Sequence, residues 1–174
     1  MFARLVMPLL SASILFACTA DDKGETDTTA PVLADAAAAE LAAVALVGGE
    51  ATEAEAVVED GFDLWEVYVT LGNGAELEVL LFAEEGALFE IFDGVGPFDY
   101  DTLDPLPGML TYAEARDVAF AEVDGEQTTW EVKYTDEGYF YEFYVLQVGD
   151  QLWEIKLWAD DGEVFVVEAV EDVD

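Results

Sequence analysis

The stretch LWEVYVTLGNGAELEVLLFAEEGALFEI, residues 64–91, occurs twice in this chain of 174 residues. Displaced by 76 positions, it aligns without a gap on FYEFYVLQVGDQLWEIKLWADDGEVFVV, residues 140–167. The two stretches share eight identities in 28 positions, where roughly two are expected by chance from average residue usage. A period this long is typical of a duplicated α+β unit, because solenoid repeats have periods of about 20–50 residues.

Each copy is preceded by a segment with helical spacing. In residues 35–47 the apolar positions recur at i, i+3, i+4 and i+8, which defines one face of a helix. That face comprises Ala38, Leu41, Ala42 and Leu46. Asp35 is suited to be the N-cap, and Gly48 with Gly49 is suited to end the helix.

The second helical segment begins at residue 111. Thr111 and Glu114 form a capping-box pattern, in which each side chain satisfies a free backbone N–H at the start of the helix. The predicted apolar face repeats the first one with a displacement of 77 positions: Ala115, Val118, Ala119 and Val123. The helix therefore belongs to the repeat.

Alternating strands follow each helix. Residues 64–71 and 76–82 alternate apolar and polar side chains, and Gly72-Asn73-Gly74 between them is typical of a tight turn. The sequence therefore predicts an α+β fold of two tandem repeats, each a helix packed on a small antiparallel β-meander sheet. The predicted organisation is a signal peptide (1–17), a flexible tether (18–31), repeat 1 (32–92), a connector (93–108) and repeat 2 (109–174).

The composition limits the classes of partner. Apolar residues make up 53% of the chain, which is ample for a hydrophobic core, yet the formal net charge is −35. Such a chain repels nucleic acid and anionic membrane surfaces. The sequence therefore predicts no nucleic-acid binding, and it favours cations or cationic protein surfaces as partners.

The N-terminus has the pattern of an export signal. Arg4 precedes an apolar run over residues 5–16, which is shorter than the ~20 residues of a membrane-spanning helix. The run ends in Leu15-Phe16-Ala17-Cys18, which resembles the lipobox of bacterial lipoproteins, although Phe16 stands where a small residue is usual. We expect lipidation of Cys18 and a lipid-anchored protein of the cell envelope that faces the periplasm or the exterior. Cleavage after Ala20 is the alternative.

Helix, strands and a closing hairpin with an acidic turn resemble the PepSY domain family. The helix start Thr111-Tyr112-Ala113-Glu114-Ala115 and the two turn sequences AEEGAL (83–88) and ADDGEV (159–164) carry the resemblance. Alanine stands at the family's Asp position in both turns. The resemblance implies a non-catalytic exported domain with an inhibitory or regulatory binding role, for which an exported protease is one expected partner. Tandem α+β units of this kind also resemble the beta-lactamase-inhibitor-like proteins of the periplasm.

The inventory of side chains argues against catalysis. The chain has no histidine, its two serines, Ser11 and Ser13, lie in the signal, and Cys18 is its single cysteine. The common nucleophile-and-base arrangements therefore cannot be built, and we expect no enzyme activity and no cofactor. The alternatives are a calcium-binding lipoprotein, because calcium takes oxygen donors, and a purely structural component of the envelope. The weak candidates for calcium ligands are Asp99, Asp101 and Asp104 in the connector and Asp160 and Asp161 at a turn.

Aromatic side chains mark a possible interface. By strand alternation, the sheet face opposite the helix carries five aromatic residues, which are Tyr68, Phe82, Phe140, Tyr144 and Trp158. An apolar patch with a charged rim is typical of a protein-binding surface. The alternative is that the two sheets pack together or join and bury these rings. If the rings are exposed, the predicted partner is an envelope or exported protein.

Overall fold

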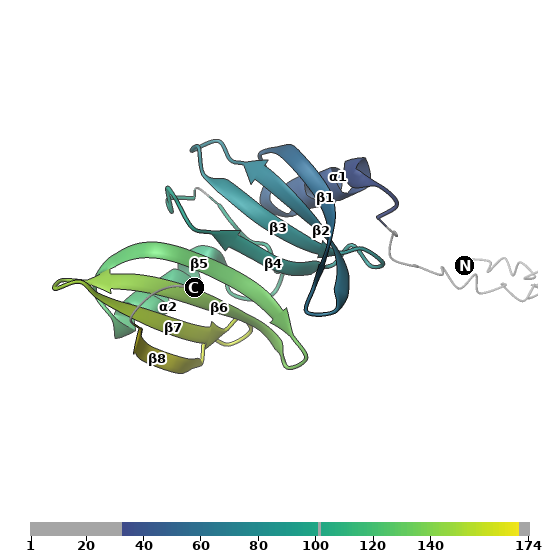
Figure 1. Ribbon diagram of the computed structural model, residues 1–174. Coiled ribbons are helices and arrows are strands. Elements are labelled where there is room, and N and C mark those ends of the chain that lie inside the picture. Colours follow the sequence, from purple (N-terminus) through teal and green to yellow (C-terminus); the bar gives the residue numbers. More distant parts are fainter. Residues whose placement is uncertain (1–32, 101, 171–174) are drawn as a thin grey trace, which may run out of the picture.

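The computed structural model describes residues 33–100 and 102–170. These residues form one antiparallel sheet of eight strands, in the order β1 to β8, and two helices (Figure 1). The strands are β1 (Glu50–Glu59), β2 (Phe62–Thr70), β3 (Glu76–Phe82), β4 (Leu88–Asp93), β5 (Glu126–Thr135), β6 (Gly138–Gln147), β7 (Gln151–Trp158) and β8 (Val164–Val170). Every strand pairs with its neighbours in the sequence, so the sheet is a continuous meander.

The predicted fold class is wrong. We expected two tandem repeats with a separate small sheet in each, but β4 pairs directly with β5 and joins all eight strands into one mostly-β structure. The junction is short, because only Glu90–Asp93 pair, with Lys133–Trp130. Two separate meanders would each leave an edge strand with unpaired backbone N–H and C=O groups. Pairing the two edges satisfies those groups.

Both helices begin where their caps predict. α1 (Ala36–Val47) is capped by the Asp35 side chain, which accepts a hydrogen bond from the Ala38 N–H. α2 (Tyr112–Glu122) begins with the complete capping box of Thr111 and Glu114. The first-turn bonds from Thr111 hold the pKa of the Glu114 carboxyl below its usual range.

The buried face of α1 differs from the predicted one. Ala39, Ala43 and Val47 are buried, whereas Leu41, on the predicted face, is 75% exposed. Seven of the twelve residues of this helix are alanine, so the apolar pattern does not select a side. The packing of the helix on the sheet selects the side instead. In α2 the predicted face is correct, since Ala115, Ala119 and Val123 are buried.

The two helices cover the same face of the sheet. α1 packs on β1 to β3 and α2 packs on β6 and β7, and both lie behind the strands in the view of Figure 1. A row of side chains across all the central strands lies beneath them in one core: Val67, Val79, Ile91, Val132, Tyr141 and Leu157. Within the described residues, no helix covers the opposite face, which we call the open face.

The connector between the halves contributes to the core. Beyond Asp93, the last residue of β4, its described residues form neither helix nor strand, but Leu103 and Leu106 are buried in the core. The buried Asp93 carboxylate accepts hydrogen bonds from the Tyr100 hydroxyl (2.6 Å) and from two backbone N–H groups. Trp130 Nε1 in turn donates to the Tyr100 hydroxyl oxygen at 2.8 Å. This chain of bonds fixes the connector against the sheet beneath α2.

Candidate functional site

The open face alternates carboxylates with aromatic rings. By strand register, this face carries many glutamates, two lysines and several aromatic residues. Six of these glutamates, on β2 to β7, are Glu66, Glu78, Glu90, Glu131, Glu142 and Glu154. Three of them, Glu90, Glu142 and Glu154, are at least 91% buried. Carboxylates with so little solvent need a cation or a proton to be stable there.

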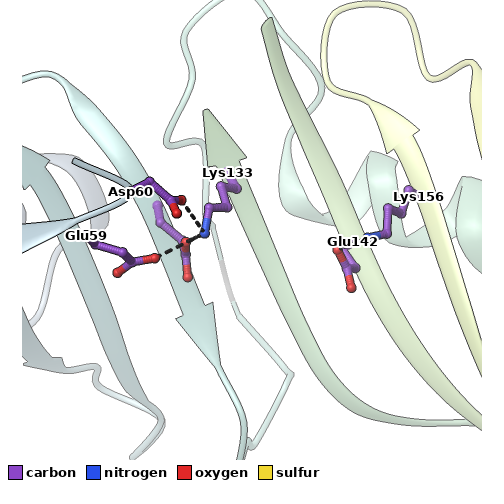
Figure 2. Close-up of polar contacts among 6 residues, drawn as sticks. Glu59, Asp60, Lys133, Glu142 and Lys156 are labelled. Carbon is purple, nitrogen blue, oxygen red and sulfur yellow. Dashed lines mark hydrogen bonds and ion pairs between the residues drawn. The ribbon is translucent and has the colours of Figure 1, made fainter. Parts of the chain in front are cut away.

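Lys133 on β5 supplies a cation at the junction of the two halves. Its Nζ lies 2.8 Å from Glu90 Oε2, 3.1 Å from Glu59 Oε1 and 3.7 Å from Asp60 Oδ2. Figure 2 shows how Glu59, the last residue of β1, and Asp60, in the β1–β2 turn, reach over to this lysine. Burial lowers the pKa of Lys133, but Glu90 and Glu59 outweigh it and raise the pKa above its ordinary value. Burial keeps the pKa of Glu90 raised despite the lysine.

Lys156 on β7 forms the second cation site. Its Nζ lies 2.8 Å from Glu142 Oε2 and 3.0 Å from Glu154 Oε1, and Figure 2 shows it beside Glu142. The Tyr144 hydroxyl also donates to Glu154 Oε1, at 3.2 Å. Burial raises the pKa of Glu154, but interactions with Glu142 and then Lys156 outweigh it and hold the pKa below its ordinary value.

The first half has the same two carboxylates without the lysine. Glu66 and Glu78 correspond to Glu142 and Glu154 at the displacement of 76 residues, but Leu80 stands where Lys156 would be. Burial, and then the neighbouring Glu66, raise the pKa of Glu78 to about 7. At neutral pH a proton therefore takes the place of the ammonium for part of the time in this half.

Glu131 lies between the two lysine sites, on β5. Its register neighbours are Phe92 on β4 and Glu142 on β6. Burial, followed by repulsion from Glu90 and Glu142, raises the pKa of Glu131 to about 8, although Lys133 and Lys156 act in the opposite direction. At neutral pH this side chain is mostly a neutral acid in the middle of the open face.

The five predicted interface residues all lie on the open face and are half-buried. Tyr68 and Tyr144 are corresponding residues that donate their hydroxyls to Glu66 and Glu154. The pKa of Tyr68 is raised to about 12, and burial of the hydroxyl is the largest cause. The two halves lie side by side in one sheet, so neither face packs on the other. The rings are thus left at the surface.

The other three predicted residues belong to two aromatic clusters at the ends of strands. Trp158 stacks on Phe165 at 4.7 Å between ring centroids, and Phe140 meets the edge of Phe165 at 6.0 Å. Phe82 lies 5.3 Å from Phe62 and 5.4 Å from Tyr134. The first cluster therefore lies within the second half, whereas the other joins Phe62 and Phe82 of the first half to Tyr134 of the second half.

The acidic calcium candidates do not converge. Asp99, Asp104, Asp160 and Asp161 are exposed, and the Asp161 carboxylate accepts a hydrogen bond from the Glu163 N–H in its own turn. Asp101 and Cys18 lie outside the described residues. Across residues 33–100 and 102–170, no group of three or more Asp, Glu, His or Cys side chains is placed to hold a metal ion. In the same residues, no helix is both long and apolar enough to cross a membrane.

Sequence reasoning missed the carboxylate–lysine sites and Glu131. The signal was present in part, because the displacement of 76 residues aligns Glu66 with Glu142 and Glu78 with Glu154. It did not show which carboxylates share a lysine, since Lys133 collects Glu59, Asp60 and Glu90 from two other strands and a turn.

Comparisons with known proteins do not assign this chain to a family. No family model matches the chain, so the resemblance to the PepSY family is not supported, and no curated protein matches it either. A solved structure of a candidate lipoprotein from Clostridium difficile 630 is similar at 16% identity, covering 69% of this chain and 82% of that one. Its TM-score is 0.36, and a likeness at this level carries no argument about function.

Proposed function

We propose that this protein is a non-catalytic lipoprotein of the cell envelope, which binds a basic protein partner through its open sheet face. The observation that carries the proposal is this face itself: half-buried aromatic rings among carboxylates, with both helices on the other side of the sheet. Aromatic anchors with a charged surround are typical of binding surfaces, and acidic groups speed the encounter with a basic partner. The finer part of the proposal is an inhibitory or regulatory role, with an exported protease as one candidate partner.

The lipid anchor has a direct test. We expect the mature chain to begin at Cys18 with acyl groups attached, because stable anchoring takes more than one acyl chain. Mass spectrometry of the N-terminal peptide from membranes measures both the start and the modification. Cys18→Ser should remain in the unprocessed form. An unmodified chain beginning at Asp21 would contradict lipidation and leave the binding proposal in place.

The binding face is tested with Trp158→Ala. Full-length protein in detergent micelles is first cross-linked to the envelope fraction of its own cells, and the captured partner is then purified. We expect Trp158→Ala to weaken the affinity for that partner by about tenfold or more, as for an aromatic anchor. The matched control is Leu41→Ala, since Leu41 is 75% exposed on α1, on the covered side of the sheet.

A folded Trp158→Ala variant is required for this comparison. Circular dichroism establishes folding, and Tyr144→Phe, which removes only one hydroxyl, provides a milder second variant. A partner that binds all open-face variants as tightly as the wild type, but loses affinity for Leu41→Ala, would place the interface on the helices instead.

A further inference from the structure

A pocket of about 490 Å³ opens at one end of the sheet. It lies where the β1–β2, β3–β4 and β5–β6 turns come together, and its lining includes Phe62, Phe82, Tyr134 and Tyr139. We propose that this pocket binds a lysine or arginine side chain from a basic segment of the partner protein. The inference rests on the proposed function and names where and how that partner is recognised.

The walls of the pocket are aromatic rings in mutual contact. Phe82 meets Phe62 edge-on at 5.3 Å and Tyr134 edge-on at 5.4 Å, and Tyr134 meets Tyr139 at 5.5 Å. The Tyr139 hydroxyl donates to the Leu88 carbonyl oxygen, which fixes that ring. Aromatic faces attract ammonium and guanidinium groups within about 6 Å of the ring centroid. The walls are therefore a surface of the kind that holds an organic cation.

The rim of the pocket is acidic. Asp63, Glu84, Glu85 and Asp136 all line it and are exposed. Among the described residues, the basic side chains are Arg116, Lys133 and Lys156, and none of them lines the pocket. The carboxylates of the rim attract a cation, and an anion would be repelled by a chain of net charge −35. Charge complementarity selects a cation.

The same aromatic cluster already holds one ammonium group of this protein. Lys133 Nζ lies 5.3 Å from the centroid of Phe89, and it is paired with Glu59 and Glu90. Phe89 in turn contacts both Phe62 (5.8 Å) and Phe82 (5.4 Å), which line the pocket. On one side of the cluster, an aromatic ring and carboxylates therefore hold a lysine of this protein. The pocket offers the same combination of ring and carboxylate to a lysine or arginine of the partner.

The size of the pocket fits a side chain from a protein segment. Its volume lies within the ~300–1,000 Å³ of small-ligand sites, so it accepts a whole lysine or arginine side chain. The opening is bordered by three turns, which leaves room for the backbone of an extended segment to pass outside. A basic segment would place one residue in the pocket and others against the acidic rim.

The test measures the affinity of full-length protein in detergent micelles for tetra-arginine amide by calorimetry. We expect binding in ~0.15 M NaCl, where charges further apart than about 8 Å are screened. Phe62→Leu should weaken it by about fivefold or more, as expected when a ring that faces a cation is lost. Phe62 is 39% exposed, so this variant keeps the fold. Tyr134→Leu is a second variant with the same expectation.

The matched control is Phe120→Leu, because Phe120 lies on α2, on the covered side of the sheet and outside the pocket. This control should bind tetra-arginine within about twofold of the wild type, and the uncharged tetra-citrulline should not bind. Equal affinity of wild type, Phe62→Leu and Tyr134→Leu would overturn the pocket and show general attraction to an acidic chain. If Trp158→Ala still loses the native partner in that case, the proposed function stands without the pocket.

Discussion

Glu131→Gln is expected to stabilise the protein at about pH 8, by about 2–3 kcal/mol, and to have little effect at about pH 5. The reason is the position of Glu131 on the open face, where burial and then Glu90 and Glu142 raise its pKa to about 8. Glutamine keeps the shape of the protonated side chain and cannot ionise.

The direction follows from proton binding in the two states. The pKa of Glu131 is about 8 in the folded protein, against an ordinary value of 4.5. Between these two values the folded protein binds more protons than the unfolded chain, so the free energy of unfolding falls as the pH rises. Glu78, with a pKa of about 7, adds to the same trend. Wild-type stability is thus greatest on the acid side of the window.

Thermal unfolding at several pH values measures this effect. We expect the Tm of wild type to fall between about pH 5 and pH 8 and the Tm of Glu131→Gln to fall less, with a gap of about 5–10 °C at the upper end. Glu122→Gln is the control, since it removes the same charge from an exposed position on α2. Parallel pH profiles for Glu131→Gln and Glu122→Gln would mean that overall charge, and not this site, sets the slope.

Lys156→Leu is expected to destabilise the protein by about 2–3 kcal/mol at about pH 8, and by much less at about pH 5. Leucine stands at the corresponding position of the first half, Leu80. Without the lysine, the Glu142 and Glu154 side chains, only 7% and 11% exposed, lose their cation. Breaking a fully buried ion pair costs about 3–5 kcal/mol, and the effect here is smaller because the Lys156 side chain is 25% exposed.

The pH dependence has a clear origin. We expect one of these two carboxyls in the variant to take a proton, so that its pKa is raised, as the pKa of Glu78 is raised to about 7 beside Glu66. The folded variant then binds more protons than its unfolded chain, and its stability is lost as the pH rises through that value. The contact of Lys156 Nζ with the Phe140 ring, at 5.7 Å, is also lost.

Two further variants separate charge from packing. Lys156→Arg keeps the cation and should stay close to wild type, whereas Lys156→Leu combined with Glu142→Gln should recover a large part of the lost stability at about pH 8. Chemical denaturation at the two pH values gives the free energies of unfolding. If Lys156→Leu loses the same stability at both pH values, the lysine acts through packing alone.

The sequence by itself determined the local elements of this protein. Asp35 and the Thr111–Glu114 capping box fixed where the helices begin, because caps act through bonds within one turn. Strand alternation also placed the five predicted aromatic residues on one face, since neighbouring side chains of a strand point to opposite sides. These features depend on residues close together in the chain, which a sequence displays directly.

Only the tertiary structure decided how the halves combine and where charges meet. β4 pairs with β5 through backbone groups, which every sequence carries. The pattern of side chains therefore did not predict one sheet in place of two. The buried side of α1 could not be predicted for a related reason. Alanine occurs on several sides of this helix, so only the packing on the sheet decides which of its residues are buried. The pKa of Glu131 is raised by burial and by carboxylates from other strands. Lys133 likewise pairs with three carboxylates that are distant from it in the sequence. Burial and Coulomb interactions depend on distance in space, and folding alone sets that distance.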